Sequence, residues 1–447
     1  MIFLNQHSLF TKHPGVEFYT WGTANVDWEY VLMCCREGKF PTDIRGRFAF
    51  YYHDADNTFA AVNHLAERPL YYTDEGRWFP VLETFAHQRQ RTTGYDLQMG
   101  MLGFCYTIGD HTPFAGISRV KPEHYYHNGV QYRYSDVAKP RGYKWNAKTY
   151  RTLLTNSMDS HIRSSYTNSM LFSSGRDSAV IASALAQIGL SSQVDFYTIE
   201  HPETSSTEYP DALVNGEEVD VAPVSLRANI VRPPHTPVEF NDSAWLVKYA
   251  TLEKHDIDGL IITGEVGNVI SYGETGKRLN YFTNCYGLTD VEALASMLCS
   301  HCENFKQTTL NCSSFSDQFD KDPTAAQPQW QMIVDEIEDD LQRWGYYTSD
   351  NLDYKRNCII NAGCLHHKVF RLRGYSTDVL RHRTWLHPLA DYYVMEYTLG
   401  LNWYERERHD CAKWYYQRAY RRSYKNAPFA ISAWNNQVRG LGIKCQE

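Results

Sequence analysis

The stretch that decides the fold is Leu171-Phe172-Ser173-Ser174-Gly175-Arg176-Asp177-Ser178, in which a short apolar run is followed by small residues and then by a helical pattern. This order predicts a strand, a tight loop and a helix in direct succession. The backbone N–H groups of such a loop and the dipole of the helix favour an anion. A phosphate beside Asp177 would need a divalent cation between the two charges, so the stretch indicates Mg²⁺-nucleotide binding. A serine-rich helix cap without a ligand is the alternative interpretation.

The residues on both sides of this stretch predict a parallel sheet. The predicted elements, in order, are a helix over 147–164, a strand over 169–172, a helix over 177–188 and a strand over 194–199. Residues 259–264 form another apolar run that ends in glycine, as in an open α/β sheet whose ligand lies at the carboxyl ends of the strands. From about residue 283 onward the pattern is mostly helical.

The first 135 residues or so have a different pattern, because short aromatic-rich runs alternate with turn signals. This alternation is typical of antiparallel β structure, and strands are predicted over 48–52, 58–62 and 69–72. A proline and a glycine between Val137 and Tyr143 mark a linker. We therefore expect two domains, 1–137 and 143–447, in a chain that is α/β overall.

Composition limits the class of protein. The 447 residues are 43% hydrophobic, which favours globular domains with sizeable cores. With 44 basic and 52 acidic residues the net charge is -8, and this balance argues against a nucleic-acid partner. No apolar run approaches the length of a membrane span, and the first residues do not form a signal peptide, so a cytoplasmic protein without a membrane partner is expected.

The eleven cysteines are scattered, which favours reduced thiols over a disulfide framework. Cys299-Ser300-His301-Cys302 has a spacing that suits zinc. Cys285 and Cys312 lie nearby in the sequence, and Cys358, Cys364, His366 and His367 lie further on. The helical rhythm from Asp290 to Phe305 favours the other interpretation, in which the sulfur atoms fill a buried helix face.

Several segments together resemble a known family. Residues 173–178 resemble the S-G-G-x-D-S pyrophosphate loop of N-type ATP pyrophosphatases, with Ser174 in place of the first glycine. Three more segments follow in the order and spacing of asparagine synthetases: 196–199 with 208–212, like the adenine-contacting strand and the acidic helix start after it; 263–268, like the S-G-E-G-x-D loop; and 387–391, like the P-F-L-D segment.

The resemblance extends to the N-terminal region. Residues 46–50 and 68–72 are similar to the G-x-F-A-F and R-P-L-Y-Y strands of the family's glutaminase domain, and 112–117 with 121–124 resemble the exit from that domain. The chain is thus identified as a divergent member of the asparagine synthetase family, which is related to β-lactam synthetases and lasso-peptide cyclases. The resemblance implies an N-terminal Ntn-hydrolase-like domain and a C-terminal adenine nucleotide α-hydrolase-like domain with helical additions.

The resemblance also implies a set of site residues, with ATP and Mg²⁺ as cofactors. Those expected at ATP and pyrophosphate are Leu171, Phe172, Ser173, Ser174, Gly175, Arg176, Asp177, Ser178, Ile199 and Gly264. Asp177 and the degenerate Asn268 are expected at the metal. Glu265 is expected to act as a general base or to orient the substrate, and Arg439 is the candidate for the family's charge-stabilising lysine.

The chain departs from the family at its catalytic positions. Ile2 stands where glutaminases have the nucleophilic cysteine, and residues 63–67 stand where they have an R-D-x-x-G run, so glutamine hydrolysis is not expected. Asn268 replaces a metal-binding aspartate, and an amide oxygen is a poorer ligand for magnesium. Val266 replaces a glycine where the backbone must come close to phosphate.

Two functions follow as hypotheses. The first is an AMP-forming ligase that activates a carboxylate, small or peptidic, and joins it to an amine. The second is a pseudoenzyme that keeps the fold for binding in a protein complex or homo-oligomer. Arg371-Leu372-Arg373 and Arg381-His382-Arg383 either line a pocket for an anionic or peptidic substrate or lie on solvated helix faces.

Overall fold

The computed structural model describes residues 10–13, 15–22, 26–80, 109–110, 112, 114–165, 167–172, 176–200, 211–214, 217–225, 252, 255–267, 289–300, 327–373 and 383–402. Their contacts divide the chain into two units. Unit 1 holds residues 1–141, 235–243 and 274–380, and unit 2 holds residues 142–234, 244–273 and 381–447. The first boundary falls within the predicted linker, whereas residues 274–380 group with unit 1.

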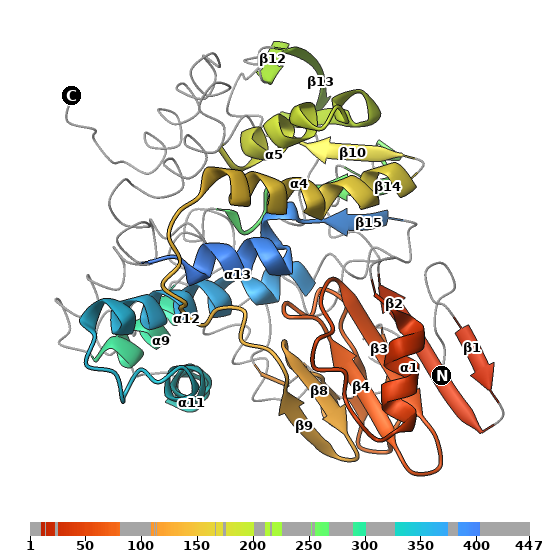
Figure 1. Cartoon of the computed structure of the whole chain (residues 1–447), viewed down its shortest axis with the longest axis vertical. Helices are drawn as coiled ribbons and strands as arrows, with labels where there is room; N and C mark the ends of the chain where they lie inside the picture. Colours follow the sequence, from red (N-terminus) through yellow and green to blue (C-terminus); the bar gives the residue numbers. More distant parts are fainter. Residues whose placement is uncertain are drawn as a thin grey trace. The chain divides into compact units, whose positions relative to one another are not determined.

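Unit 1 contains two antiparallel sheets (Figure 1). The larger sheet has the order β1-β2-β3-β4-β8-β9, with bounds β1 Phe10–His13, β2 Val16–Gly22, β3 Phe48–His53, β4 Thr58–Val62, β8 His124–His127 and β9 Val130–Arg133. The smaller sheet has the order β6-β5-β7, with bounds β5 Tyr71–Thr73, β6 Trp78–Phe79 and β7 Ile117–Arg119. The predicted strands over 48–52 and 58–62 are confirmed as β3 and β4, and the run predicted over 69–72 overlaps β5 at residues 71–72.

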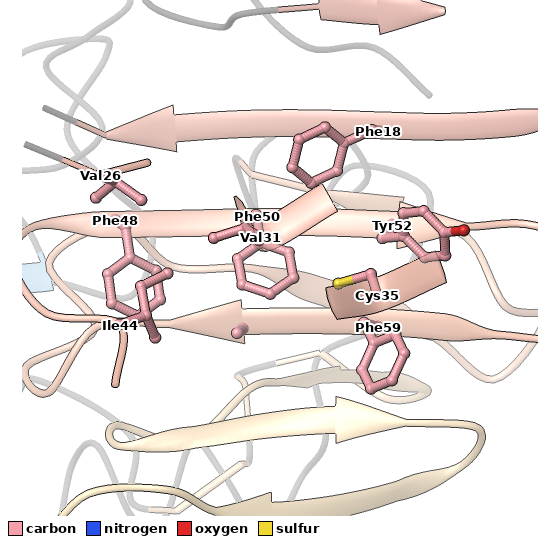
Figure 2. Packing of buried hydrophobic residues seen from close by; sticks show 10 residues of the cluster. Phe18, Val26, Val31, Cys35, Ile44, Phe48, Phe50, Tyr52 and Phe59 are labelled. Carbon is pink, nitrogen blue, oxygen red and sulfur yellow. The ribbon is translucent and has the colours of Figure 1, made fainter. Parts of the chain in front are cut away.

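Strand β3 is buried on both faces, and this explains its continuous apolar sequence. Phe48, Phe50 and Tyr52 pack against helix α1 (Trp28–Arg36), whose Val31 and Cys35 lie in the same cluster (Figure 2). The alternate residues Ala49 and Tyr51 of β3 pack in a second cluster with Trp78 of the smaller sheet and with Leu70, which precedes β5. The core of this part of unit 1 therefore consists of a helix, a sheet and a second sheet in layers.

The helices of unit 1 are α9 (Asp290–Ser300), α11 (Gln327–Arg343) and α12 (Leu352–Arg373). Buried ion pairs join α11 to strand β9. Arg133 Nη1 lies 2.6 Å from Asp340 Oδ1, and the same guanidinium also pairs with Glu123. Burial raises the pKa of Glu123, even though Arg133 and the Val137 N–H oppose that rise. Because all three charges are desolvated, each depends on the others for compensation.

We predict that Asp340→Ala lowers the free energy of unfolding by about 3 kcal/mol, because Arg133 is left buried without that partner. Asp339→Ala is the matched control on the same helix. Asp339 is 68% exposed, and its loss should cost less than about 1 kcal/mol. Urea denaturation of both variants measures the difference, and equal losses would contradict a structural role for the buried pair.

Unit 2 contains a six-stranded sheet with the order β12-β13-β11-β10-β14-β15 (Figure 1). The bounds are β10 Asn168–Leu171, β11 Asp195–Glu200, β12 Asp211–Val214, β13 Glu217–Ser225, β14 Gly259–Ile262 and β15 Arg383–Leu386. All neighbouring pairs are parallel except β12 with β13. Numbered 1 to 5 along the chain, the parallel strands lie in the order 3-2-1-4-5, which reverses between β10 and β14. This is the order of a doubly wound sheet.

The helices next to these strands begin and end close to the predicted positions. Helix α4 spans Ala147–Ser164, and α5 spans Arg176–Gln187. Asn146 caps α4 by accepting hydrogen bonds from the N–H groups of Lys148 and Thr149, at 2.9 and 3.1 Å. Further along the chain, the short helix η4 (Pro388–Ala390) and α13 (Tyr392–Gly400) follow β15. The mixture of helices with a parallel sheet is therefore confirmed for unit 2.

One sequence prediction about this region is wrong. The acidic helix start expected over 208–212 is contradicted at Asp211, because Asp211–Val214 is strand β12 and pairs antiparallel with β13. Val214 pairs with Glu217, so the connection is a two-residue hairpin with the sequence Asn215-Gly216. Asn-Gly is the strongest short signal for such a hairpin, and it outweighs the helical interpretation. Residues 208–210 lie outside the described residues.

Candidate functional site

The candidate site lies at the carboxyl ends of β10 and β14. These strands are parallel neighbours, and Met170 pairs with Ile262 near their ends. Phe172 continues from β10 and donates its N–H to the Tyr197 carbonyl at 2.8 Å, and α5 begins at Arg176. The order of the sheet reverses between these two strands, and such reversals are where doubly wound sheets bind their ligands.

The loop after β14 touches the first turn of α5. A Cβ atom placed on Gly264 would lie 2.9 Å from Asp177 Cβ and 3.0 Å from Ser178 N. Only glycine fits at that separation without a shift of the backbone. The contact brings together two segments separated by more than eighty residues, one that carries Asp177 and one in which Glu265 directly follows Gly264. Asp177, in the first turn of α5, also has the charge sign that a helix N-terminus favours.

Thr263 and His387 form a buried polar pair beside this contact. Both are about 97% removed from solvent, at 3% and 2% exposure, and Thr263 Oγ1 lies 2.7 Å from His387 Nδ1. The Thr263 N–H donates to the Leu386 carbonyl at 3.0 Å, so β14 and β15 are joined by backbone as well as side chain. The Glu265 N–H donates to Thr263 Oγ1 at 3.4 Å. The pair therefore fixes the loop that carries Glu265.

His387 was not among the predicted site residues, although it begins the segment 387–391 that resembles the P-F-L-D segment of asparagine synthetases. The signal that points to it is positional: His387 follows strand β15 directly, and the carboxyl ends of parallel strands meet at one edge of the sheet.

Val266 has an unusual backbone conformation. Its φ is +75°, and its side chain is 2% exposed. A β-branched residue rarely adopts this left-handed conformation, which glycine adopts freely. Val266 stands where asparagine synthetases have a glycine, and in this conformation the valine strains the backbone at the candidate site.

The structure describes some of the predicted site residues and not others. Phe172 is buried and lies edge-on to Phe196 with ring centroids 6.1 Å apart, while Leu171 is the last residue of β10. Ile199 pairs with Val224 near the carboxyl end of β11. Arg176 is the first residue of α5. The predicted residues that lie outside the described residues are Ile2, Ser173, Ser174, Gly175, Asn268 and Arg439.

The cysteine spacings are only partly described. Cys358 and Cys364 are buried thiols on α12, and burial raises the pKa of Cys358 to about 12. Cys299 lies in α9, as its helical rhythm predicts, while Cys285, Cys302 and Cys312 lie outside the described residues. Within the described ranges, no group of three or more His, Cys, Asp or Glu side chains is arranged to hold a metal ion. No described helix is long and apolar enough to cross a membrane.

The two arginine runs have different outcomes. Arg383 is buried in strand β15, where its Nε donates to the Ile257 carbonyl at 2.6 Å and lies 3.3 Å from Asp258. It is 3% exposed and lies in a strand, which contradicts the solvated helix face for this residue, while the substrate-pocket interpretation stays a prediction. The hydrophobic sheet allows such a charge because the guanidinium is paired at the strand end. Helix α12 ends with residues 371–373. Arg381 and His382 lie outside the described residues.

Compared with known proteins, the chain matches no protein-family model and no curated protein. The resemblance to asparagine synthetases therefore stays a prediction from short motifs.

We predict that Gly264→Ala lowers the free energy of unfolding by about 2 kcal/mol, because the new methyl group overlaps Asp177 and the α5 backbone. Gly189→Ala at the other end of α5 is the control. Gly189 has a φ of +71° and no neighbour within 4 Å of an added Cβ, so its cost should be about 1 kcal/mol from backbone conformation alone. If chemical denaturation shows no larger loss for Gly264→Ala, the loop does not depend on that contact.

A second prediction concerns the strain at Val266. Both Val266→Ala and Val266→Gly remove buried side-chain atoms, but only glycine relieves the left-handed backbone. Val266→Gly should therefore be about 1 kcal/mol more stable than Val266→Ala. At Val180, buried inside α5, the order should reverse by about 1 kcal/mol in favour of alanine. The same order of Ala and Gly at both positions, measured by urea denaturation, would contradict strain at Val266.

Proposed function

We propose that the protein is an ATP-dependent, AMP-forming ligase that joins a carboxylate to an amine and does not hydrolyse glutamine. The observation that supports this proposal is the contact between Gly264 and the first turn of α5. It joins the two sequence segments with the strongest nucleotide-binding pattern at the point where the order of the sheet reverses.

The chemistry would proceed in two steps. A carboxylate oxygen of the substrate attacks the α-phosphorus of ATP, the bond from that phosphorus to the bridging oxygen breaks, and pyrophosphate leaves. The amine nitrogen then attacks the acyl carbon, AMP leaves with the bonding electron pair, and the amine proton passes to a base. Glu265 is the candidate base or orienting group because it directly follows Gly264 in the loop that meets Asp177.

A bound Mg²⁺ would supply charge neutralisation for the triphosphate and the leaving pyrophosphate. Oxygen donors are what this metal prefers, and Asp177 in the first turn of α5 fits that preference. Asn268 would add only a neutral amide oxygen, so we expect weaker metal binding than two carboxylates would give. Because Ile2 replaces the glutaminase nucleophile, the amine or ammonia would enter directly instead of coming from glutamine.

The strain at Val266 favours a second candidate, a non-catalytic protein that keeps the fold for binding. A buried valine in a left-handed conformation fills a place where glycine would leave room for a phosphate. In this candidate the protein would act through a stoichiometric complex with another protein or with itself.

The test is calorimetric titration with Mg²⁺-ATP, followed by a pyrophosphate-release assay with a panel of carboxylic acids and amines. Asp177→Asn should weaken Mg²⁺-ATP binding about tenfold or more, since a charge-assisted contact is worth about 1.5–3 kcal/mol. Asp159→Asn is the matched control, because Asp159 is a half-exposed carboxylate on α4 that pairs with Arg163. It should bind Mg²⁺-ATP like the parent.

The outcome separates the two candidates. Nucleotide binding and acid-dependent pyrophosphate release, both weakened in Asp177→Asn, would support the ligase. No binding by the parent, together with recovery of the native chain in a stoichiometric complex, would support the non-catalytic candidate and end the ligase proposal.

A further inference from the structure

The loop after strand β4 in unit 1 is buried along its whole length. All six residues from Asn63 to Arg68 are buried, and four of them are polar or charged. Loops with this composition usually run over the surface, because water satisfies their polar groups there. We call residues 63–68 the buried polar loop. Its polar groups need partners inside the protein or from a bound species.

One ion pair anchors the buried polar loop. Arg47, which precedes β3 and is 7% exposed, donates from Nε to Glu67 Oε2 at 2.5 Å. The Glu67 N–H in turn donates to Asn63 Oδ1 at 3.1 Å. These contacts hold the guanidinium, the carboxylate and the amide in one connected group.

Two donors of this group have no acceptor. In the part of the chain that the structure describes, Arg47 Nη1 and Asn63 Nδ2 are fully buried and make no hydrogen bond. A second guanidinium, that of Arg68, belongs to the same loop. Burial, and after it the charge of Arg47, lower the pKa of Arg68 to about 9. A buried donor without an acceptor is destabilising, and more so when it carries charge.

We propose that the buried polar loop and Arg47 bind a small monovalent anion, of the size of chloride or formate, which accepts hydrogen bonds from Arg47 Nη1 and Asn63 Nδ2. Both open positions are donors, so the missing species is an acceptor, and the cationic guanidinium selects an anion. A dianion such as phosphate is disfavoured, because Glu67 already contributes a negative charge and burial of extra charge is costly. This site is independent of the proposed ligase activity.

The experiment is thermal unfolding of the full chain over a range of sodium chloride or sodium formate concentrations. Sodium gluconate holds the ionic strength constant, because that bulky anion cannot enter a buried site. Above the dissociation constant of the bound anion, the Tm of the parent should rise by about 2 °C for each tenfold increase in concentration. The steeper of the two curves identifies a halide or a carboxylate as the preferred anion.

Asn63→Asp is the diagnostic variant. It keeps Oδ1 for the Glu67 N–H and replaces the open donor with a carboxylate oxygen, so the protein supplies the missing negative charge itself. Its Tm should not respond to chloride or formate. Asn168→Asp is the matched control, because both N–H groups of Asn168 already donate, to the Ile162 and Gln193 carbonyls at 3.3 and 3.0 Å. That variant should lose stability and keep the anion response of the parent.

A direct measurement keeps the proposal testable if Asn63→Asp does not fold. The chloride-35 NMR line of a sodium chloride solution should broaden on addition of the parent protein and sharpen again when formate competes. A parent Tm that is independent of both anions at constant ionic strength, together with an unbroadened chloride line, would overturn the proposal and leave water as the acceptor. An undiminished anion response in folded Asn63→Asp would overturn it as well.

Discussion

The close approach of Gly264 to the first turn of α5 is the constraint on which the candidate site depends. At its two ends, strand β14 comes close to the residue before β10 and to the helix that follows β10. At the first residue of β14, a Cβ on Gly259 would lie 1.9 Å from Thr167 Oγ1, and after the strand a Cβ on Gly264 would lie 2.9 Å from Asp177 Cβ. Two glycines therefore set how far β14 can approach its neighbour. The position of Glu265 relative to Asp177 follows from that spacing and from the parallel register of the strands.

Local pattern predicts the elements of this protein well. Helix α4 and strand β4 have the predicted bounds, and β10, α5 and β11 are each shifted from the prediction by one residue at both ends. Each of these segments is short, has a clear period and is bounded by a cap or a turn, so the local free energy and the tertiary packing favour the same structure. The candidate site is predictable for the same reason, because its residues follow directly after strands.

Features that depend on distant residues are not predictable in this way. Residues 274–380 group with unit 1. The ion pairs between this range and the strand region include Lys121 with Glu336 and Arg133 with Asp340, and the partners are more than two hundred residues apart in the sequence. A charged residue on α11 has the same local pattern whether it meets solvent or a buried arginine. The resemblance to asparagine synthetases predicted a helix start at 208–212, although the local sequence Asn215-Gly216 favours a hairpin. Strands β12 and β13 pair as that local sequence favours.

Backbone strain is concentrated where buried polar groups meet. Among the described residues, five non-glycine residues have positive φ. Asn128 and Asp256 are exposed and belong to residue types that tolerate this conformation. The other three are buried: Ala66 in the buried polar loop, Glu123 in the ion network of α11, and Val266 at the candidate site. Such strain persists only where the surroundings fix the backbone, and it clusters at sites that bind or switch. The three positions therefore mark the places where this fold gives up stability to hold polar groups in a set geometry.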